Sequence, residues 1–202
     1  MYREFFSRTM IIVFAAIAAA VSGAALAQNQ MPSTGTLTDN NTASSMTLDE
    51  AKEQYLAAWN QTEFDAAFST FVEEFSAAGY GVYQEHGNVF RPGETMVLYV
   101  EPVGFDHEQV IDEEGNTLYL MNMTADYVIA SGNGTELQVI EDIPVGSIVS
   151  HRSNMELFLE LTLTQASPFP VGDYLITYVV TDEVSGESFM LEKQVTVAES
   201  PS

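Results

Sequence analysis

The chain has 202 residues, a length that fits one domain with a tail and excludes a large multidomain enzyme. Its 29 Asp and Glu outnumber its 6 Lys and Arg, and the formal net charge of −23 repels nucleic-acid backbones and anionic lipid surfaces. It contains no Cys, which excludes disulfides, thiolate catalysis, zinc–thiolate sites and iron–sulfur clusters.

Residues 1–27 have the arrangement of an export signal. Two arginines precede an unbroken apolar run, Met10–Val21, and small residues then lead up to Ala27. As a helix this run would rise only about 18 Å, which is too short to cross a hydrocarbon core of about 30 Å. We therefore expect cleavage after Ala27 and a secreted or extracytoplasmic location, in a periplasm or at a cell surface. Glu4 and both arginines would leave with the signal, so 28 acidic and 4 basic side chains would remain.

The next two segments differ in their hydrophobic pattern. Residues 28–46 are rich in Ser, Thr, Asn and Gln and have no hydrophobic period, which predicts a disordered polar spacer. Thr47 and Glu50 match a capping box, in which each side chain accepts a hydrogen bond from the other's backbone amide, so a helix should begin there. Apolar residues then recur every three or four positions, which predicts a helical segment over residues 47–79. Its aromatic stripe should pack on the following domain or, alternatively, on a partner protein. The stripe consists of Phe64, Phe68, Phe71 and Phe75.

From residue 80 onward the hydrophobic period changes to two, which predicts strands with one buried face. The alternation is clearest over Tyr119–Ile129 and Met155–Thr164. Five further strands are predicted at Gly81–Glu85, Thr95–Glu101, Glu136–Ile140, Tyr174–Thr181 and Phe189–Val197. Turn signals separate them, among them Arg91–Glu94, which suits a type II turn. Seven strands without intervening helices predict a mainly β, antiparallel sandwich over residues 80–199.

One segment carries a resemblance to a known class of domains. Pro170–Asp182, PVGDYLITYVVTD, resembles the penultimate strand of immunoglobulin-like and fibronectin-type-III-like domains, with Tyr174 in the place of the tyrosine that bonds to upstream backbone. Phe90–Glu94 likewise resembles the entry to an early strand of exported members. The resemblance implies a seven-stranded immunoglobulin-like sandwich preceded by a short helical segment. The chain differs from antibody domains because it lacks their two cysteines, and its single Trp, Trp59, lies in the predicted helix. As a whole it resembles uncharacterised exported envelope proteins of archaea, which implies no function.

No catalytic motif is complete. His107-Glu108 lacks the second His that a metalloprotease helix requires, and Gly146-Ser147 lacks the second Gly of a nucleophile elbow. Ser150 and His151 are neighbours, so on a strand their side chains would point to opposite faces. We therefore expect a protein without enzymatic activity. An enzyme that acts on an extracellular polymer through a pair of carboxylates is a third alternative, because so acidic a chain contains many such pairs.

The densest group of acids is Asp106–Asn116, DHEQVIDEEGN. Ca²⁺ binds six to eight oxygen ligands in loose geometry, so the segment offers a candidate calcium site. Its candidate ligands are Asp106, Glu108, Asp112 and Glu114. The spacing does not match an EF-hand, and the competing interpretation is a solvated hairpin that ends at Gly115-Asn116. The three histidines with Met121 and Met123 suggest copper, but methionines on a buried strand face are ordinary core residues.

Four Asn-x-Ser/Thr sequons are candidate glycan attachment sites in an exported chain. They lie at Asn40, Asn60, Asn122 and Asn133.

These patterns predict an exported, acidic, non-enzymatic module that binds to the cell envelope or forms part of it. We expect protein or glycan components of the envelope as partners, no nucleic acid, and no membrane insertion after signal cleavage. No resident cofactor is expected under this interpretation. The alternative is an extracytoplasmic metal-binding carrier, which would hold Ca²⁺ in the acidic segment or copper at the histidines and methionines.

Overall fold

The computed structural model describes residues 46–199, so the predicted export signal and almost all of the predicted spacer lie outside the described residues. One helix occurs in this range, α1 (Leu48–Trp59). No helix among these residues has the length and apolar character needed to span a membrane. Most of the regular structure consists of strands, so the protein is mainly β with one short helix, as the sequence predicts.

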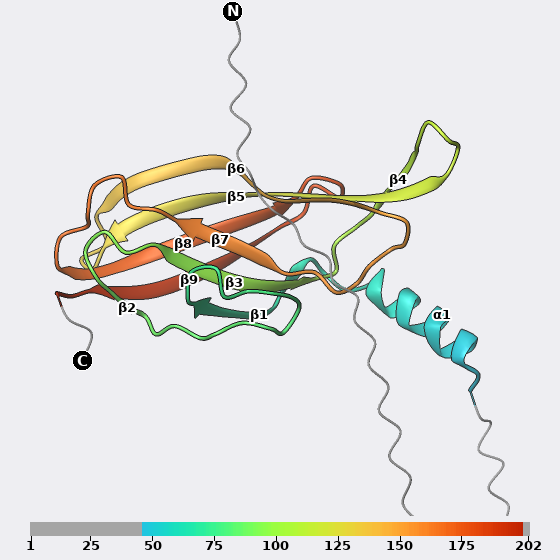
Figure 1. The fold of residues 1–202 in the computed structure, drawn as a ribbon, viewed down its shortest axis with the longest axis horizontal. Coiled ribbons are helices and arrows are strands. Elements are labelled where there is room, and N and C mark those ends of the chain that lie inside the picture. The colour runs from blue at the N-terminus through green and yellow to red at the C-terminus, as the bar shows by residue number, and fades with distance from the viewer. Residues whose placement is uncertain (1–45, 200–202) are drawn as a thin grey trace, which may run out of the picture. The chain divides into compact units, whose positions relative to one another are not determined.

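Nine strands lie within the same range and form two sheets (Figure 1). They are β1 (Asp65–Val72), β2 (Val89–Phe90), β3 (Met96–Val103), β4 (Glu108–Ile111), β5 (Thr117–Ser131), β6 (Glu136–Ser150), β7 (Leu159–Leu163), β8 (Gly172–Asp182) and β9 (Ser188–Val197). The predicted total of seven was too low, because β1 has a helix-like hydrophobic spacing and β2 and β4 are too short to show a period.

The smaller sheet has the order β1-β3-β7 and is antiparallel throughout. The larger sheet contains β2, β9, β8, β5, β4 and β6, and only its β2–β9 pair is parallel. In its centre, β5 pairs with β8 through residues 123–131, with β4 through residues 117–120, and with β6 along almost its whole length. Residues of β5 that pair with β4 or with β8 also pair with β6. Therefore β4 and β8 lie along one edge of β5, and β6 lies along the other edge.

One apolar core lies between the two sheets. Every second side chain of β5, from Met121 to Ile129, is buried, and so is every second side chain of β7, from Leu159 to Leu163. The burial of Met121 and Met123 confirms that these methionines fill the core. Strand β3 is buried on both faces, because the connection between β1 and β2 covers the face of the smaller sheet that points away from the core.

The helical segment predicted over residues 47–79 is correct only for α1. The capping box is confirmed, since the Thr47 amide donates to the Glu50 carboxylate at 2.7 Å and the Glu50 amide donates to the Thr47 hydroxyl at 3.2 Å. Residues 65–72 form strand β1 instead and pair with β3. Phe68 and Phe71 are three residues apart and lie on opposite faces of β1, one exposed and one buried, so their spacing resembles that of a helix. The strand depends on its pairing with β3, which no local pattern reveals.

Three strand boundaries also need correction. Gly81–Glu85 takes part only in isolated bridges, β7 begins at Leu159 rather than Met155, and β6 continues past Ile140 to Ser150. The type II turn at Arg91–Glu94 has the expected geometry: the Glu94 N–H donates to the Arg91 carbonyl at 3.0 Å, and Gly93 has a φ of 83°.

Candidate binding surfaces

The acidic segment Asp106–Asn116 forms the β3–β4 connection, strand β4 and the β4–β5 turn. In the turn, the Asp112 carboxylate accepts hydrogen bonds from the Asn116 backbone N–H at 2.7 Å and from Asn116 Nδ2 at 2.9 Å. These bonds, the side-chain bond first, lower the pKa of Asp112. Glu108 lies in β4 and Glu114 in the turn, and both are exposed. The segment is therefore a β-hairpin whose turn is closed by its own Asp and Asn.

The backbone of Asp106 forms a hydrogen bond with a residue that is far away in the sequence. Its backbone N–H donates to Oδ2 of Asp182 at 2.9 Å, and Asp182 is fully buried. The Val184 N–H and the Ser185 hydroxyl also donate to this carboxylate. The buried charge is thus compensated by hydrogen bonds and links the β3–β4 connection to the β8–β9 hairpin. Sequence analysis missed Asp182, because it ends a regular strand and one of its partners is far away in the sequence.

The four predicted calcium ligands are not brought together. Within residues 46–199, no group of three or more His, Asp or Glu side chains is arranged to hold a metal ion. The three histidines also serve separate contacts. His86 Nε2 lies 3.4 Å from Oε1 of Glu94, His107 Nε2 lies 3.0 Å from the Asn154 carbonyl oxygen, and the His151 side chain is exposed.

Three of the four sequons fall within the described residues, and Asn40 lies outside them. Asn60 is exposed immediately after α1. Asn122 is half-buried in β5, where strands pair on both edges. Asn133 is exposed in the β5–β6 turn, and its Oδ1 accepts hydrogen bonds from the Ser131 hydroxyl and the Thr135 N–H. Asn60 and Asn133 are therefore the more accessible of these three.

Residues 73–88, between β1 and β2, cover the outer face of the smaller sheet, and we call them the aromatic loop. Tyr99 of β3 anchors this loop: its hydroxyl accepts from the Gly81 N–H at 2.7 Å and donates to Oε1 of Glu101 at 2.8 Å. Burial raises the pKa of Tyr99, so the hydroxyl stays protonated and can keep donating. The Tyr83 ring of the loop packs on the Tyr99 ring, with ring centroids 4.5 Å apart.

Hydrogen bonds within the aromatic loop fix its path. The Glu73 N–H donates to the Gln84 carbonyl at 2.9 Å, and the Ala78 N–H donates to the Val82 carbonyl at 2.9 Å. The Gln84 N–H donates to the Ser76 hydroxyl at 3.2 Å. The loop therefore displays its side chains from a defined backbone.

The aromatic loop and the adjoining strand expose large apolar side chains. Phe75 is 90% exposed and has a φ of 62°, a left-handed conformation that bulky residues rarely adopt. Such strain costs about 1–3 kcal/mol and clusters at functional sites. Val82 is 56% exposed, Tyr80 is 41% exposed, and Phe68 of β1 is 39% exposed. We call these four residues the apolar display.

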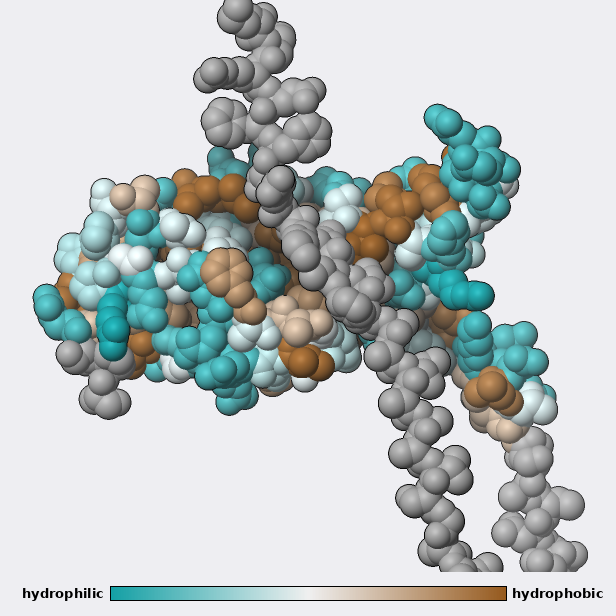
Figure 2. All heavy atoms as spheres, in the orientation of Figure 1, coloured by the Kyte–Doolittle hydropathy of each residue, from teal (hydrophilic) through white to brown (hydrophobic). Residues whose placement is uncertain are grey.

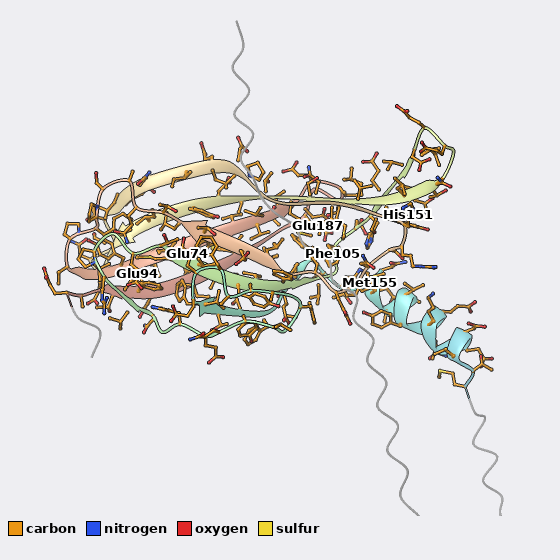
Figure 3. The ribbon with its side chains drawn as sticks, in the orientation of Figure 1. Glu74, Glu94, Phe105, His151, Met155 and Glu187 are labelled. Carbon is orange, nitrogen blue, oxygen red and sulfur yellow. The ribbon has the colours of Figure 1, made fainter. Side chains whose placement is uncertain are left out.

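Acidic residues accompany the apolar display. Glu73 and Glu74 directly precede Phe75, Glu85 follows later in the loop, and all three carboxylates are exposed. Figure 3 labels Glu74. No Lys or Arg occurs between Glu73 and Phe90 in the sequence. None of these three carboxylates forms a salt bridge among the described residues, so this surface combines exposed apolar groups with negative charge.

Sequence analysis missed this surface because it placed four phenylalanines on one helix. Phe64 and Phe71 are buried in the core, whereas Phe68 and Phe75 are exposed. No local sequence signal indicates the left-handed backbone of Phe75, since that conformation is usual for glycine and rare for a bulky side chain.

A second feature is a hollow of about 290 Å³ near the last turn of α1, which we call the Trp59 hollow. Figure 3 labels Phe105 and Met155, two of the residues that line it. The Trp59 indole N–H donates to the Phe105 carbonyl at 3.0 Å. The full lining is Leu56, Trp59, Asn60, Phe105, Asp106, His107, Gln109, Tyr119, Ser153 and Met155. The hollow thus brings together Asn60, Asp106 and His107, which the sequence analysis had considered separately.

No model of a known protein family matches the sequence. No curated protein is significantly similar to it.

Proposed function

We propose that this chain is an exported, non-enzymatic binding module of the cell envelope, and that it contacts a protein partner through the aromatic loop. The observation that carries this proposal is Phe75, a large apolar side chain held almost fully exposed on a strained and anchored backbone. Export is supported by the signal-like order of residues 1–27.

The energetics of the apolar display favour a binding role. Fully burying a Phe side chain contributes about 1.5–3 kcal/mol. The fold gains this from Phe64 and Phe71 but not from Phe75, which is 90% exposed. A partner that covers Phe75, Tyr80 and Val82 would recover the burial energy. Such anchors, presented by a rigid scaffold, are the usual source of affinity at interfaces.

The negative charge of the aromatic loop indicates which kind of partner surface would fit it. The carboxylates of Glu73, Glu74 and Glu85 would meet any protein that covers the loop. A partner with an apolar pocket rimmed by Lys or Arg would complement them, and the long-range attraction would speed association at low salt. A second copy of this acidic chain would instead place like charges together.

We further propose that the fold is immunoglobulin-like. Support comes from Tyr174, whose hydroxyl donates to the Pro170 carbonyl at 2.8 Å, the bond expected of the tyrosine corner in that class. The two sheets around one core are compatible with this class. The nine strands and the parallel β2–β9 pair depart from the seven-stranded antiparallel form. Because such a scaffold serves many functions, the proposal depends on the loop and not on the fold.

The binding proposal is tested with a double variant, Phe75→Ser with Tyr80→Ser. Envelope proteins captured by the immobilised mature chain are identified, and any candidate is purified for calorimetry against wild type and variant. We expect the double variant to weaken binding at least about tenfold and added salt to weaken wild-type binding. Met190→Ser is the matched control, because Met190 is 61% exposed on β9, outside the loop. Equal affinities for all three proteins would overturn the assignment of the surface.

A further inference from the structure

We propose that the Trp59 hollow binds a small organic cation that carries a methylated ammonium group. The site lies outside the aromatic loop, so this inference goes beyond the proposed function and does not depend on it. Its support comes from the arrangement of three rings packed around the buried Phe105, the hydrogen bonds that fix two of them, the charge of the lining and the size of the hollow.

Neighbouring rings of the hollow lie at angles of 50° to 86° to one another. The Trp59 and Phe105 rings have centroids 5.0 Å apart and an interplanar angle of 85°. The His107 and Tyr119 rings have centroids 6.2 Å apart and an angle of 86°, and the Phe105 and His107 rings have centroids 5.4 Å apart. Because the Phe105 ring is fully buried, the rings that a ligand in the hollow could touch are those of Trp59, His107 and Tyr119, and these do not form one flat platform. Aromatic boxes recognise methylated ammonium groups, because ring faces attract a cation within about 6 Å.

Two of these rings are fixed by hydrogen bonds to backbone. The Trp59 indole N–H donates to the Phe105 carbonyl at 3.0 Å, and His107 Nε2 lies 3.0 Å from the Asn154 carbonyl oxygen. A carbonyl oxygen only accepts hydrogen bonds, so Nε2 carries a proton and a neutral His107 ring keeps its lone pair on Nδ1. Phe105 is fully buried, so its ring supports the Trp59 and His107 rings that it packs against and does not itself face a ligand. The walls are therefore in place before a ligand arrives, which lowers the entropic cost of binding.

The charge of the lining favours a cation. Asp106 contributes a carboxylate, and no Lys or Arg is among the described residues that line the hollow. The whole chain carries a formal net charge of −23, which attracts cations and repels anionic ligands. An ammonium group surrounded by methyl groups suits this combination, because its apolar surface can contact the rings while its charge faces Asp106.

The size of the hollow limits the ligand. Its volume of about 290 Å³ lies at the lower end of the range of roughly 300–1,000 Å³ that is typical of ligand pockets. A choline-sized molecule is a suitable occupant. The amide groups of Asn60 and Gln109 and the hydroxyls of Ser153 and Tyr119 also line the hollow and could bond to a hydroxyl at the far end of such a cation.

The test uses the mature chain and the fluorescence of Trp59, which is its single tryptophan. Choline chloride and tetramethylammonium chloride are titrated, and NaCl at matched ionic strength is the blank. The key control is 3,3-dimethylbutan-1-ol, which has the shape of choline without its charge. We expect a saturable fluorescence change with both cations, and binding of the neutral alcohol at least about tenfold weaker than that of choline.

Variants assign the binding to the hollow. Tyr119→Leu and Asp106→Asn should each weaken choline binding severalfold, because the first removes a wall and the second removes the charge. Glu113→Gln also replaces a carboxylate by an amide, but away from the hollow, and should leave choline binding unchanged. Thermal unfolding of each variant shows whether it remains folded.

Three results would overturn the inference. Equal affinity for choline and the neutral alcohol would show an apolar hollow without cation recognition. Saturable binding of glucose with no response to choline would assign the site to another ligand class. No saturable change with either cation would leave the hollow without this role, while the aromatic loop could still bind its partner.

Discussion

At the scale of single residues, the hydroxyl of Tyr178 is a buried group with no hydrogen-bond partner among the described residues. The Tyr178 ring meets the Tyr127 ring edge to face, with centroids 5.1 Å apart, and burial raises the pKa of Tyr178. An unsatisfied buried hydroxyl costs about 1–3 kcal/mol. We therefore expect Tyr178→Phe to leave stability unchanged or to raise it by up to about 1 kcal/mol in urea unfolding. A loss of more than about 1 kcal/mol would show that an internal water satisfies the hydroxyl.

Gly104 occupies a position that no other residue can take without strain. Its φ is 72°, and a Cβ atom there would lie 2.5 Å from the carbonyl oxygens of both Thr62 and Glu63. Gly104→Ala should therefore lose several kcal/mol, since about 1–2 kcal/mol of backbone strain adds to a clash with backbone atoms. Gly115→Ala is the matched control, because Gly115 has a φ of 85° and nothing within 4 Å of the added atom. Equal losses in urea unfolding would contradict the predicted contact.

The residues that could be predicted from the sequence are those with local partners. The Thr47–Glu50 capping box and the Gly93 turn depend on neighbours three residues apart, and both have the expected geometry. The Tyr99 hydroxyl and the Asp182 carboxylate each form a hydrogen bond with a residue in another element, so the neighbouring sequence does not indicate their roles.

At the scale of elements, β6 is an edge strand with features that hinder pairing with a strand of another molecule. Within residues 46–199 it pairs only with β5, and Figure 2 shows hydrophobic residues at the surface along it. Leu137 and Val139 are among its exposed apolar residues. Asp142 has a φ of 58° and donates its N–H to Oδ1 of Asp126 at 2.8 Å, and Pro144 follows without an N–H. A distorted backbone, an acid and a proline are the usual protections of an exposed edge.

Replacing Asp142 and Pro144 should promote self-association through the edge of β6. We expect the double variant Asp142→Val with Pro144→Val to form dimers or larger species at concentrations where wild type does not, measured by analytical ultracentrifugation. Glu113→Val is the control, because it adds the same apolar side chain at the β4–β5 turn. If the double variant and the control sediment like wild type, the edge is protected by something other than these two residues.

The success of sequence prediction also differs between elements. The long alternation of β5, paired on both edges, identified that strand almost to its ends. Strand β1 looked helical because Phe68 and Phe71 are three residues apart and continue the spacing of Phe64 and Phe75, and only its pairing with β3 decides its conformation. The aromatic loop follows β1, so the same error hid the candidate surface.

At the scale of the whole molecule, negative charge should oppose compaction. The mature chain would carry 28 acidic and 4 basic side chains, and the described residues contain one salt bridge, between His86 and Glu94. Added NaCl should therefore raise the melting temperature by screening repulsion. CaCl₂ at matched ionic strength should raise the melting temperature by nearly the same amount as NaCl, because the predicted calcium ligands are not grouped.

The control for calcium is the double variant Asp112→Asn with Glu114→Gln. A specific site would stabilise the wild type by about 2.7 kcal/mol when calcium reaches one hundred times the Kd, and the variant would lose that gain. A calcium-specific rise in melting temperature that disappears in this variant would revive the metal-carrier hypothesis.

The central claim is that the aromatic loop is the contact surface for a protein partner. The most direct measurement places a photoreactive phenylalanine analogue, p-benzoylphenylalanine, at position 75 in cells of the source organism and analyses the products after irradiation. The same analogue at position 190 is the control, because Met190 is also apolar and exposed but belongs to β9. The account predicts a discrete cross-linked product at position 75, with a partner that carries a basic surface, and no such product at position 190. Absence of a product at position 75, or the same product at both positions, would contradict it.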